Sequence, residues 1–140
     1  MKIKFKAMVL SCIDPRFQPI VYNYLKKKKL TGKYSSFTIA GASIGVTHNR
    51  FKRWHKTFID NLSTSIILHK IEKLIVINHE DCGAAKIVNS KKNFHNLNEI
   101  KIDEIFFLKI KKIIKKKFPN LKIDLNFIKL NKKIKKINEF

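Results

Sequence analysis

Short apolar runs alternate along the chain with segments whose apolar residues recur at helical spacing. Runs of this kind are typical of buried strands, and we expect strands at residues 4–11, 34–39, 74–78 and 121–130. The run at 74–78 (LIVIN) is almost wholly apolar, as in a central parallel strand covered on both faces. Helical spacing predicts longer helices at residues 17–30, 50–69 and 103–118, and the small residues from position 83 suit the start of another.

This alternation of strands and helices predicts the fold class. Helices that cross between neighbouring strands are typical of α/β proteins with right-handed connections. We therefore expect one α/β domain over residues 1–140, with a central, mostly parallel sheet of about four strands flanked by helices. A chain of 140 residues can bury one such core, and no internal repeat or linker divides it. The polar tail from about residue 131 is expected to be flexible or helical.

The chain is strongly basic, with a formal net charge of +21 and a pI near 10.1. Such a charge usually indicates nucleic acid or an anionic membrane surface as a partner. Only 3 of the 31 basic residues are arginine, however, and lysine is spread over almost every polar face. Because grooves that read phosphates favour the planar fork of arginine, this pattern indicates a compositional bias and a solvated surface. A basic nucleic-acid-binding module therefore stays as the less favoured alternative.

The sequence shows no pattern typical of export or of a membrane span. The apolar stretch after the basic N-terminus is too short for the core of a signal peptide. No run approaches the roughly 18 apolar residues of a transmembrane helix. With only 2 cysteines in the chain, reduced thiols are a better interpretation than a disulfide framework. We expect a soluble, cytoplasmic protein.

Residues with metal-binding and acid–base chemistry gather directly after two of the expected strands. Cys12, Asp14 and Arg16 follow the first strand, and His79 and Cys82 follow the third. If these strands are neighbours in a parallel sheet, two sulfurs and one imidazole meet at the same edge. That ligand set suits tetrahedral zinc, with a fourth position left for water as in catalytic sites. A lone cysteine, or an Asp–Arg pair alone, would be explained more simply as a core residue or a salt bridge, but their coincidence predicts a zinc enzyme.

Asp14 and Arg16 are placed to control the fourth position of such a zinc ion. Zinc held by two thiolates and a neutral imidazole carries no net charge, so it polarises water less than zinc held by three histidines. Asp14 can accept a hydrogen bond from zinc-bound hydroxide or ligate the zinc itself. Arg16 can clamp Asp14 through its planar fork and keep the carboxylate ionised.

Together these motifs resemble those of the β-class carbonic anhydrases. The pattern is Cys-x-Asp-x-Arg, a strand ending in Ala-Gly, and His-x-x-Cys-Gly after an apolar strand, carried here by Cys12, Asp14, Arg16, Ala40, Gly41, His79, Cys82 and Gly83. The resemblance implies the fold of that family, Zn²⁺ held by Cys12, His79 and Cys82, and reversible hydration of carbon dioxide to bicarbonate by a zinc-bound hydroxide. In the family, the Asp–Arg pair switches the site between an open state and a closed state with Asp as fourth ligand. The small-residue loops are expected to bind the substrate through Gly41, Ala42 and Gly83.

Two features depart from the family pattern. Thr38 and Ile39 stand where members usually carry Arg-Asn before the Ala-Gly pair, and the chain is short for the family. The same zinc ligands occur in relatives that act on carbonyl sulfide or carbon disulfide, so such a hydrolase, or a zinc-binding homologue without turnover, remains an alternative. His48, His55 and His95 are candidate proton shuttles by residue type alone, and none is preferred.

The resemblance also has implications for quaternary structure. β-class enzymes form dimers or multiples of dimers, and both subunits line the active-site cleft. We therefore expect a homodimer or a higher multiple, with Gln18, Tyr34 and Phe37 as candidate cleft walls. A net charge of +21 per subunit opposes association at low salt, so the interface must bury a large apolar area.

Overall fold

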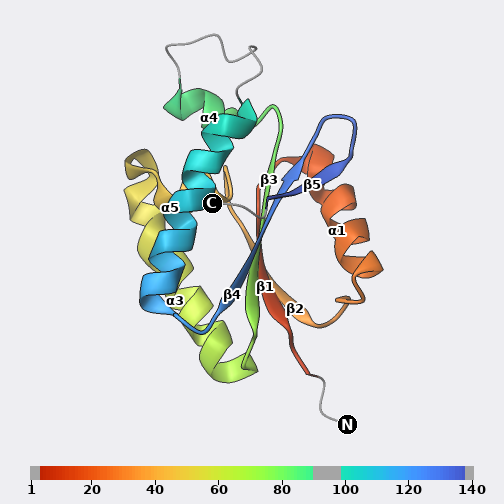
Figure 1. Ribbon diagram of the computed structural model, residues 1–140, viewed down its shortest axis with the longest axis vertical. Coiled ribbons are helices and arrows are strands. Elements are labelled where there is room, and N and C mark those ends of the chain that lie inside the picture. The colour runs from red at the N-terminus through yellow and green to blue at the C-terminus, as the bar shows by residue number, and fades with distance from the viewer. Residues whose placement is uncertain (1–3, 90–98, 138–140) are drawn as a thin grey trace.

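One mostly parallel sheet of five strands forms the centre of the computed structural model, which describes residues 4–89 and 99–137 (Figure 1). The strands are β1 (Ala7–Ser11), β2 (Tyr34–Thr38), β3 (Lys73–His79), β4 (Lys122–Ile128) and β5 (Ile134–Ile137). Their order in the sheet is β2-β1-β3-β4-β5. The first four strands are parallel to their neighbours and β5 runs antiparallel to β4. The expected α/β fold class is thereby confirmed.

Helices cover both faces of the sheet. They are α1 (Gln18–Lys27), α2 (Ser43–Thr47), α3 (Lys52–His69), α4 (Gly83–Val88) and α5 (Glu99–Lys117), with 3₁₀ turns at Pro15–Phe17 and Asn49–Phe51. Figure 1 shows α1 on one face of the sheet and α3 with α5 on the other. The short helix α2 contacts both α3 and α5. Among residues 4–89 and 99–137, no helix has the length and apolar character needed to cross a membrane.

The two faces of β1 show how the core is built. All five of its residues are buried, and successive side chains point to opposite faces because a strand has a side-chain period of two. Met8 and Leu10 pack into the core on the side of α3 and α5. Ala7 and Val9 pack against α1. β3 is likewise buried on both faces, as predicted for the run at 74–78.

The C-terminal tail differs from the expectation of a flexible or helical segment. Residues Ile134–Ile137 form β5, which pairs with β4 through a turn that Lys132 closes at a φ of 70°. The pattern hides this strand because it is short and lies at the edge of the sheet, where lysines face solvent. Helix α5 also begins at Glu99, four residues before the predicted start.

The connections place one crevice at the carboxyl ends of β1 and β3. After β1 the chain crosses through α1 to β2, and after β2 it returns through α3 on the other face to β3. At the carboxyl ends of these two neighbouring strands, the chain leaves β1 towards α1 on one face of the sheet and leaves β3 towards α4 and α5 on the other. Such a switch point is where open α/β sheets usually bind ligands.

Candidate active site

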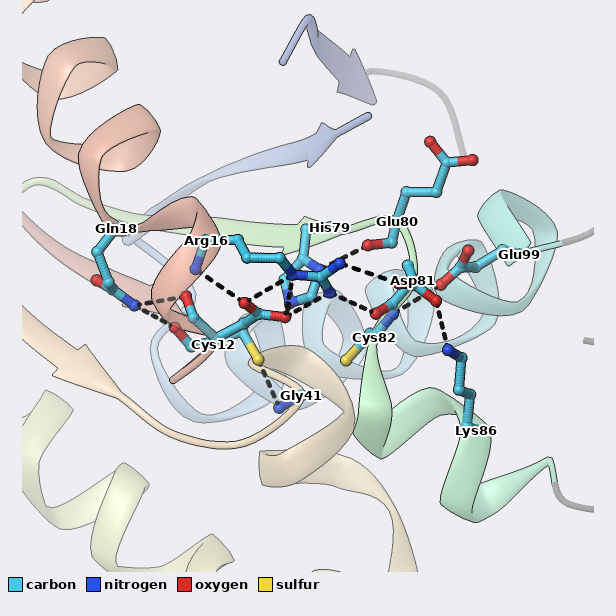
Figure 2. A network of polar contacts seen from close by, with 11 residues as sticks. Cys12, Arg16, Gln18, Gly41, His79, Glu80, Asp81, Cys82, Lys86 and Glu99 are labelled. Atoms are coloured by element: carbon cyan, nitrogen blue, oxygen red, sulfur yellow. Dashed lines mark hydrogen bonds and ion pairs between the residues drawn. The ribbon is translucent and has the colours of Figure 1, made fainter. Parts of the chain in front are cut away.

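Three ligand-type side chains meet at this crevice. Cys12 directly follows β1, His79 is the last residue of β3, and Cys82 is the N-cap of α4. All three are buried, and their sulfur and nitrogen atoms lie within 4.8 Å of one another. Figure 2 shows the two sulfurs on either side of the His79 ring. The sheet order explains the convergence, because β1 and β3 are hydrogen-bonded neighbours.

The His79 ring is oriented with one nitrogen free. Its Nδ1 lies 2.8 Å from the Glu80 carbonyl oxygen, which can only accept a hydrogen bond, so Nδ1 carries the proton. Its Nε2 is buried and has no hydrogen-bond partner among the described residues. Phe17 stacks on the ring with a centroid distance of 4.1 Å and holds its plane. This is the tautomer and the second hydrogen bond typical of a metal-binding histidine.

The pKa values of the two thiols move apart. The adjacent Cys82 thiol, followed by the His79 ring and the Gly41 amide, lowers the pKa of Cys12 despite burial. The Cys12 sulfur, together with burial, raises the pKa of Cys82. Two bare thiolates this close repel each other, so the pair retains a proton. A divalent cation would remove that repulsion, and two thiolates with one neutral imidazole are donors that fit zinc.

Gly41 brings a backbone amide against the Cys12 sulfur. Its N–H donates to Sγ at 3.3 Å, and the residue has a φ of +80°. A Cβ at this position would lie 2.7 Å from the Cβ of Ala84. Only glycine therefore allows the loop after β2 to pass this close to α4 and to stabilise negative charge on the sulfur.

Asp14 is clamped by Arg16 beside the three ligand-type residues. The Arg16 side chain donates to Oδ2 of Asp14 from one terminal nitrogen at 2.7 Å and to both oxygens from Nε, and the Arg16 backbone N–H donates to Oδ1 at 2.9 Å. These hydrogen bonds hold the pKa of Asp14 below its usual value of 3.8. Oδ2 of Asp14 lies 3.9 Å from Nε2 of His79. An ionised carboxylate therefore faces the point where the ligands converge.

Arg16 also joins the two loops of the site. One terminal nitrogen donates to Oδ2 of Asp81 at 3.0 Å and the other to the Asp81 carbonyl oxygen at 3.1 Å. The Lys86 ammonium pairs with the other carboxylate oxygen of Asp81 (Figure 2). Asp81 adopts a φ of 60°, which turns the chain between His79 and Cys82. The guanidinium thus links Asp14 in the first loop to Asp81 in the second, which lies 65 residues after Arg16 in the sequence.

A cleft of about 580 Å³ lies beside the ligand cluster, and Cys12 is the ligand-type residue that lines it. Apart from Asp14 and Arg16, its walls are apolar side chains and backbone, from Cys12, Ile13, Pro15, Ala40, Gly41, Gly83, Ala84 and Ile87. Of the predicted substrate-binding residues, Gly41 and Gly83 line this cleft. Ala42 does not, because its methyl group is fully buried in the core beneath α2. The cleft has room for a small molecule with little hydrogen-bonding demand.

Comparison with known protein families agrees with this geometry. The sequence profile of a family described as "Putative carbonic anhydrase" matches residues 1–138. The chain belongs to this family. The predicted resemblance to the carbonic anhydrases is thereby confirmed over almost the whole chain.

Two relatives of the chain come from Rickettsia. An uncharacterised protein of Rickettsia bellii is 28% identical over 134 residues, which cover 95% of this chain and 82% of the relative. An uncharacterised protein of Rickettsia conorii is 27% identical over 118 residues, which cover 84% of this chain and 63% of the relative. The chain therefore spans less than two thirds of the second relative.

Solved structures of β-carbonic anhydrases share the fold of this carbonic anhydrase family member. A tetrameric enzyme from Sordaria macrospora superposes with a TM-score of 0.65 at 10% identity, over 99% of this chain and 83% of that one. An enzyme from Aspergillus fumigatus gives a TM-score of 0.60 at 9% identity, over 96% of this chain and 76% of that one. At such identities the likeness shows the fold alone.

Other predicted site residues lie away from the cleft. Gln18 supports the site loop from behind, since its Nε2 donates to the Cys12 carbonyl oxygen at 2.7 Å. Phe37 packs edge-to-face on Phe58 in the core, and Tyr34 packs on the α1 side of the sheet, so neither lines the cleft within one chain.

Two of the three histidines considered as proton shuttles, His48 and His55, do not line the cleft either. Nδ1 of His48 accepts from the Arg50 N–H at 3.0 Å, and Nε2 of His55 lies 3.0 Å from the His48 carbonyl oxygen. His55 lines a separate cavity between α2, α3 and α5. His95 lies outside the described residues.

Sequence reasoning missed several residues that support the site. Glu99, at the start of α5, accepts from the Cys82 backbone N–H at 3.0 Å. Asp81 binds Arg16, and Phe17 stacks on His79. A signal existed for Glu99, because its acidic side chain stands four residues before Asp103 in a segment otherwise rich in lysine, which places both on one helix face.

Proposed function

We propose that this protein catalyses the zinc-dependent, reversible hydration of carbon dioxide to bicarbonate. The observation that carries the proposal is the convergence of Cys12, His79 and Cys82 within 4.8 Å, beside a carboxylate that Arg16 keeps ionised. Membership of the carbonic anhydrase family supports the same reaction.

Zinc would be held by the sulfurs of Cys12 and Cys82 and by Nε2 of His79. When bound, zinc lowers the pKa of water so that hydroxide is available near neutral pH. The Glu80 carbonyl keeps His79 in the tautomer with a free Nε2, and the Gly41 amide stabilises the charge on the Cys12 sulfur. These residues fix the ligands before any metal arrives.

Asp14 orients the attacking group in this mechanism. Its carboxylate can only accept hydrogen bonds while it is ionised, so it aligns a water or hydroxide whose O–H points toward it. Arg16 holds Asp14 through several hydrogen bonds and limits its rotation toward the metal. Release of this clamp would let Asp14 become the fourth ligand of a closed site.

The walls of the cleft favour a small, linear, weakly polar substrate. Ile13, Ile87 and Ala84 offer no hydrogen-bond donors or acceptors from their side chains, as suits carbon dioxide. Carbonyl sulfide and carbon disulfide have the same shape and similar polarity. A zinc hydrolase of those substrates is therefore the second candidate, and a zinc-binding homologue without turnover is the third.

Stopped-flow hydration of carbon dioxide by the zinc-loaded protein tests the proposal. We expect turnover by the wild type that is lost in Cys82→Ser. In Asp14→Asn the turnover should fall by about 10²-fold or more, because asparagine keeps the shape of the side chain but removes its negative charge. Asp124→Asn is the matched control, since Asp124 is a similarly half-buried carboxylate paired with Lys73 outside the cleft.

The same assay with carbonyl sulfide and carbon disulfide separates the candidates. Absence of carbon dioxide turnover between about pH 6 and pH 9 would remove the proposed function. Turnover of a sulfur compound alone would then favour the second candidate. Zinc bound at one ion per chain without any turnover would favour the third.

The remaining expectations concern partners. Exposed Ile13 and Ile87 at the mouth of the cleft support a second subunit there, so sedimentation analysis is expected to give a dimer or a multiple of dimers. A cytoplasmic location stays a prediction. Nucleic-acid binding that falls steeply with salt and ignores zinc would instead favour the basic-module alternative.

A further inference from the structure

Behind the candidate metal site, three buried polar side chains from three different elements form a chain of hydrogen bonds. Asn78, which precedes His79 in β3, accepts at Oδ1 from the backbone N–H and the hydroxyl of Ser43, at 3.2 and 3.0 Å. Its Nδ2 donates to Oδ1 of Asp103 in α5 at 2.5 Å. All three side chains are at most 2% exposed. Burying polar groups costs free energy unless they are hydrogen-bonded, whereas apolar side chains would fill the same space without that requirement. A buried polar chain at this position therefore calls for a role other than filling space.

At one end, this chain of hydrogen bonds fixes the loop that contacts Cys12. Ser43 is the first residue of α2, and the N-cap Ala42 has no side chain that can accept from the first turn. Asn78 supplies that missing acceptor from the neighbouring strand. Gly41, two residues before Ser43, donates its N–H to the Cys12 sulfur. Any shift of Ser43 would therefore move the amide away from the sulfur.

At the other end, α5 reaches the second loop of the site. Asp103 lies one turn after Glu99, which accepts from the backbone N–H of Cys82. Helix α5 thus holds Cys82 directly and, through Asn78, the strand end that carries His79. Oδ2 of Asp103 has no hydrogen-bond partner among the described residues. Burial, opposed by the hydrogen bond from Asn78, raises the pKa of Asp103 to about 7, so the carboxyl is neutral below that pH.

We propose that Asp103 is a positioning residue of the metal site that acts through Asn78. Asn78 holds Ser43, and Ser43 keeps the Gly41 amide against the Cys12 sulfur. Asp103 contributes an acceptor oxygen rather than a negative charge, because its other oxygen is buried without a partner. The inference rests on the metal-binding half of the proposed function.

Two substitutions of Asp103 separate the acceptor oxygen from the charge. Asp103→Asn keeps an oxygen for Asn78, whereas Asp103→Leu has a similar size and no acceptor. We measure the zinc dissociation constant by competition with a chromophoric chelator and the visible spectrum of the Co²⁺-substituted protein. Asp103→Leu is expected to weaken zinc binding about 10- to 100-fold and to change the cobalt d–d bands. Asp103→Asn is expected to stay within about threefold of the wild type with an unchanged spectrum.

Asn126→Ala controls for a general loss of stability. Asn126 is fully buried on β4, where it accepts from the Tyr24 hydroxyl and donates to the Val76 carbonyl oxygen. This variant is expected to lower the free energy of unfolding while it leaves zinc affinity and the cobalt spectrum unchanged. Zinc affinity in Asp103→Leu equal to the wild type, or equal losses in Asp103→Asn and Asp103→Leu, would overturn the inference. An equal loss in Asn126→Ala would overturn it as well.

If Asp103→Leu does not fold, Ser43→Ala decides the question. It removes one hydroxyl from the same chain of hydrogen bonds and is expected to weaken zinc binding about three- to tenfold, whereas unchanged affinity would refute the role. These readouts do not need turnover. A wild-type protein that binds zinc but does not hydrate carbon dioxide would therefore overturn the proposed function and leave the inference intact, and one that binds no zinc would overturn the inference.

Discussion

Substitution of Gly41 by alanine tests whether the close approach of two loops builds the site. The new Cβ would lie 2.7 Å from the Cβ of Ala84 and 3.1 Å from that of Ile44, at a φ of +80°. A positive φ costs a residue with a Cβ about 1–2 kcal/mol, and overpacking adds about 1–3 kcal/mol. We therefore expect Gly41→Ala to lower the free energy of unfolding by about 2–5 kcal/mol.

Gly32 offers a matched control for this substitution. It has a similar φ of +75°, but a Cβ there would meet no atom within 4 Å. Gly32→Ala should therefore show only the backbone cost, about 1–2 kcal/mol. Urea unfolding of the metal-free proteins, compared through their midpoints at equal m values, measures both effects.

The same pair of variants also tests the link to the ligands. Because the Gly41 amide donates to the Cys12 sulfur, Gly41→Ala should weaken zinc binding by about tenfold or more, and Gly32→Ala should leave it unchanged. If the two variants differ by less than about 0.5 kcal/mol in stability and bind zinc equally, the packing argument is wrong.

Three further predictions concern pH and metal. Arg16 lowers the pKa of Asp14, so above pH 3.8 the free energy of unfolding should be smaller in Arg16→Gln than in the wild type. This difference between the two proteins should vanish as pH falls through the pKa that Asp14 has in the folded wild type. A difference that stays constant across this range in urea unfolding would contradict the prediction. The pKa of Asp103 is raised to about 7, so the free energy of unfolding of the wild type should fall by up to about 4 kcal/mol relative to that of Asp103→Asn as pH rises from 3.8 to about 7. Equal pH profiles of stability for the two proteins would argue against a buried carboxyl. Removal of zinc by a chelator should lower the free energy of unfolding by about 4 kcal/mol, relative to protein in free zinc at about 1,000 times its dissociation constant. A melting temperature that does not change would count against a structural metal site.

The sequence was sufficient to predict the four parallel strands and the ligand cluster because both depend on local patterns. An apolar run of strand length signals burial on both faces, and the carboxyl ends of neighbouring parallel strands meet at one edge. Cys12 and His79 each stand directly after or at the end of such a run. Their convergence therefore needed only the correct strand order.

The supporting contacts could not be predicted in this way. Asn78 lies inside an apolar run, and nothing local indicates that its partners are Ser43 and a carboxyl of α5. Ala42 stands among small loop residues, yet its positive φ of 49° turns the methyl group into the core rather than the cleft. Strand β5 was hidden because its pairing partner, rather than its own lysine-rich composition, stabilises it.

The position of the two sulfurs in loops that follow different strands has a consequence for folding. Cys12 and Cys82 are separated by about 70 residues, and they approach each other only after the chain has completed both crossovers. An ion bound by both sulfurs would close that long loop as a disulfide does, and a loop of this length removes about 4 kcal/mol of chain entropy from the unfolded ensemble. Zinc would then act as a reversible cross-link, and its retention would report that β1 and β3 have paired.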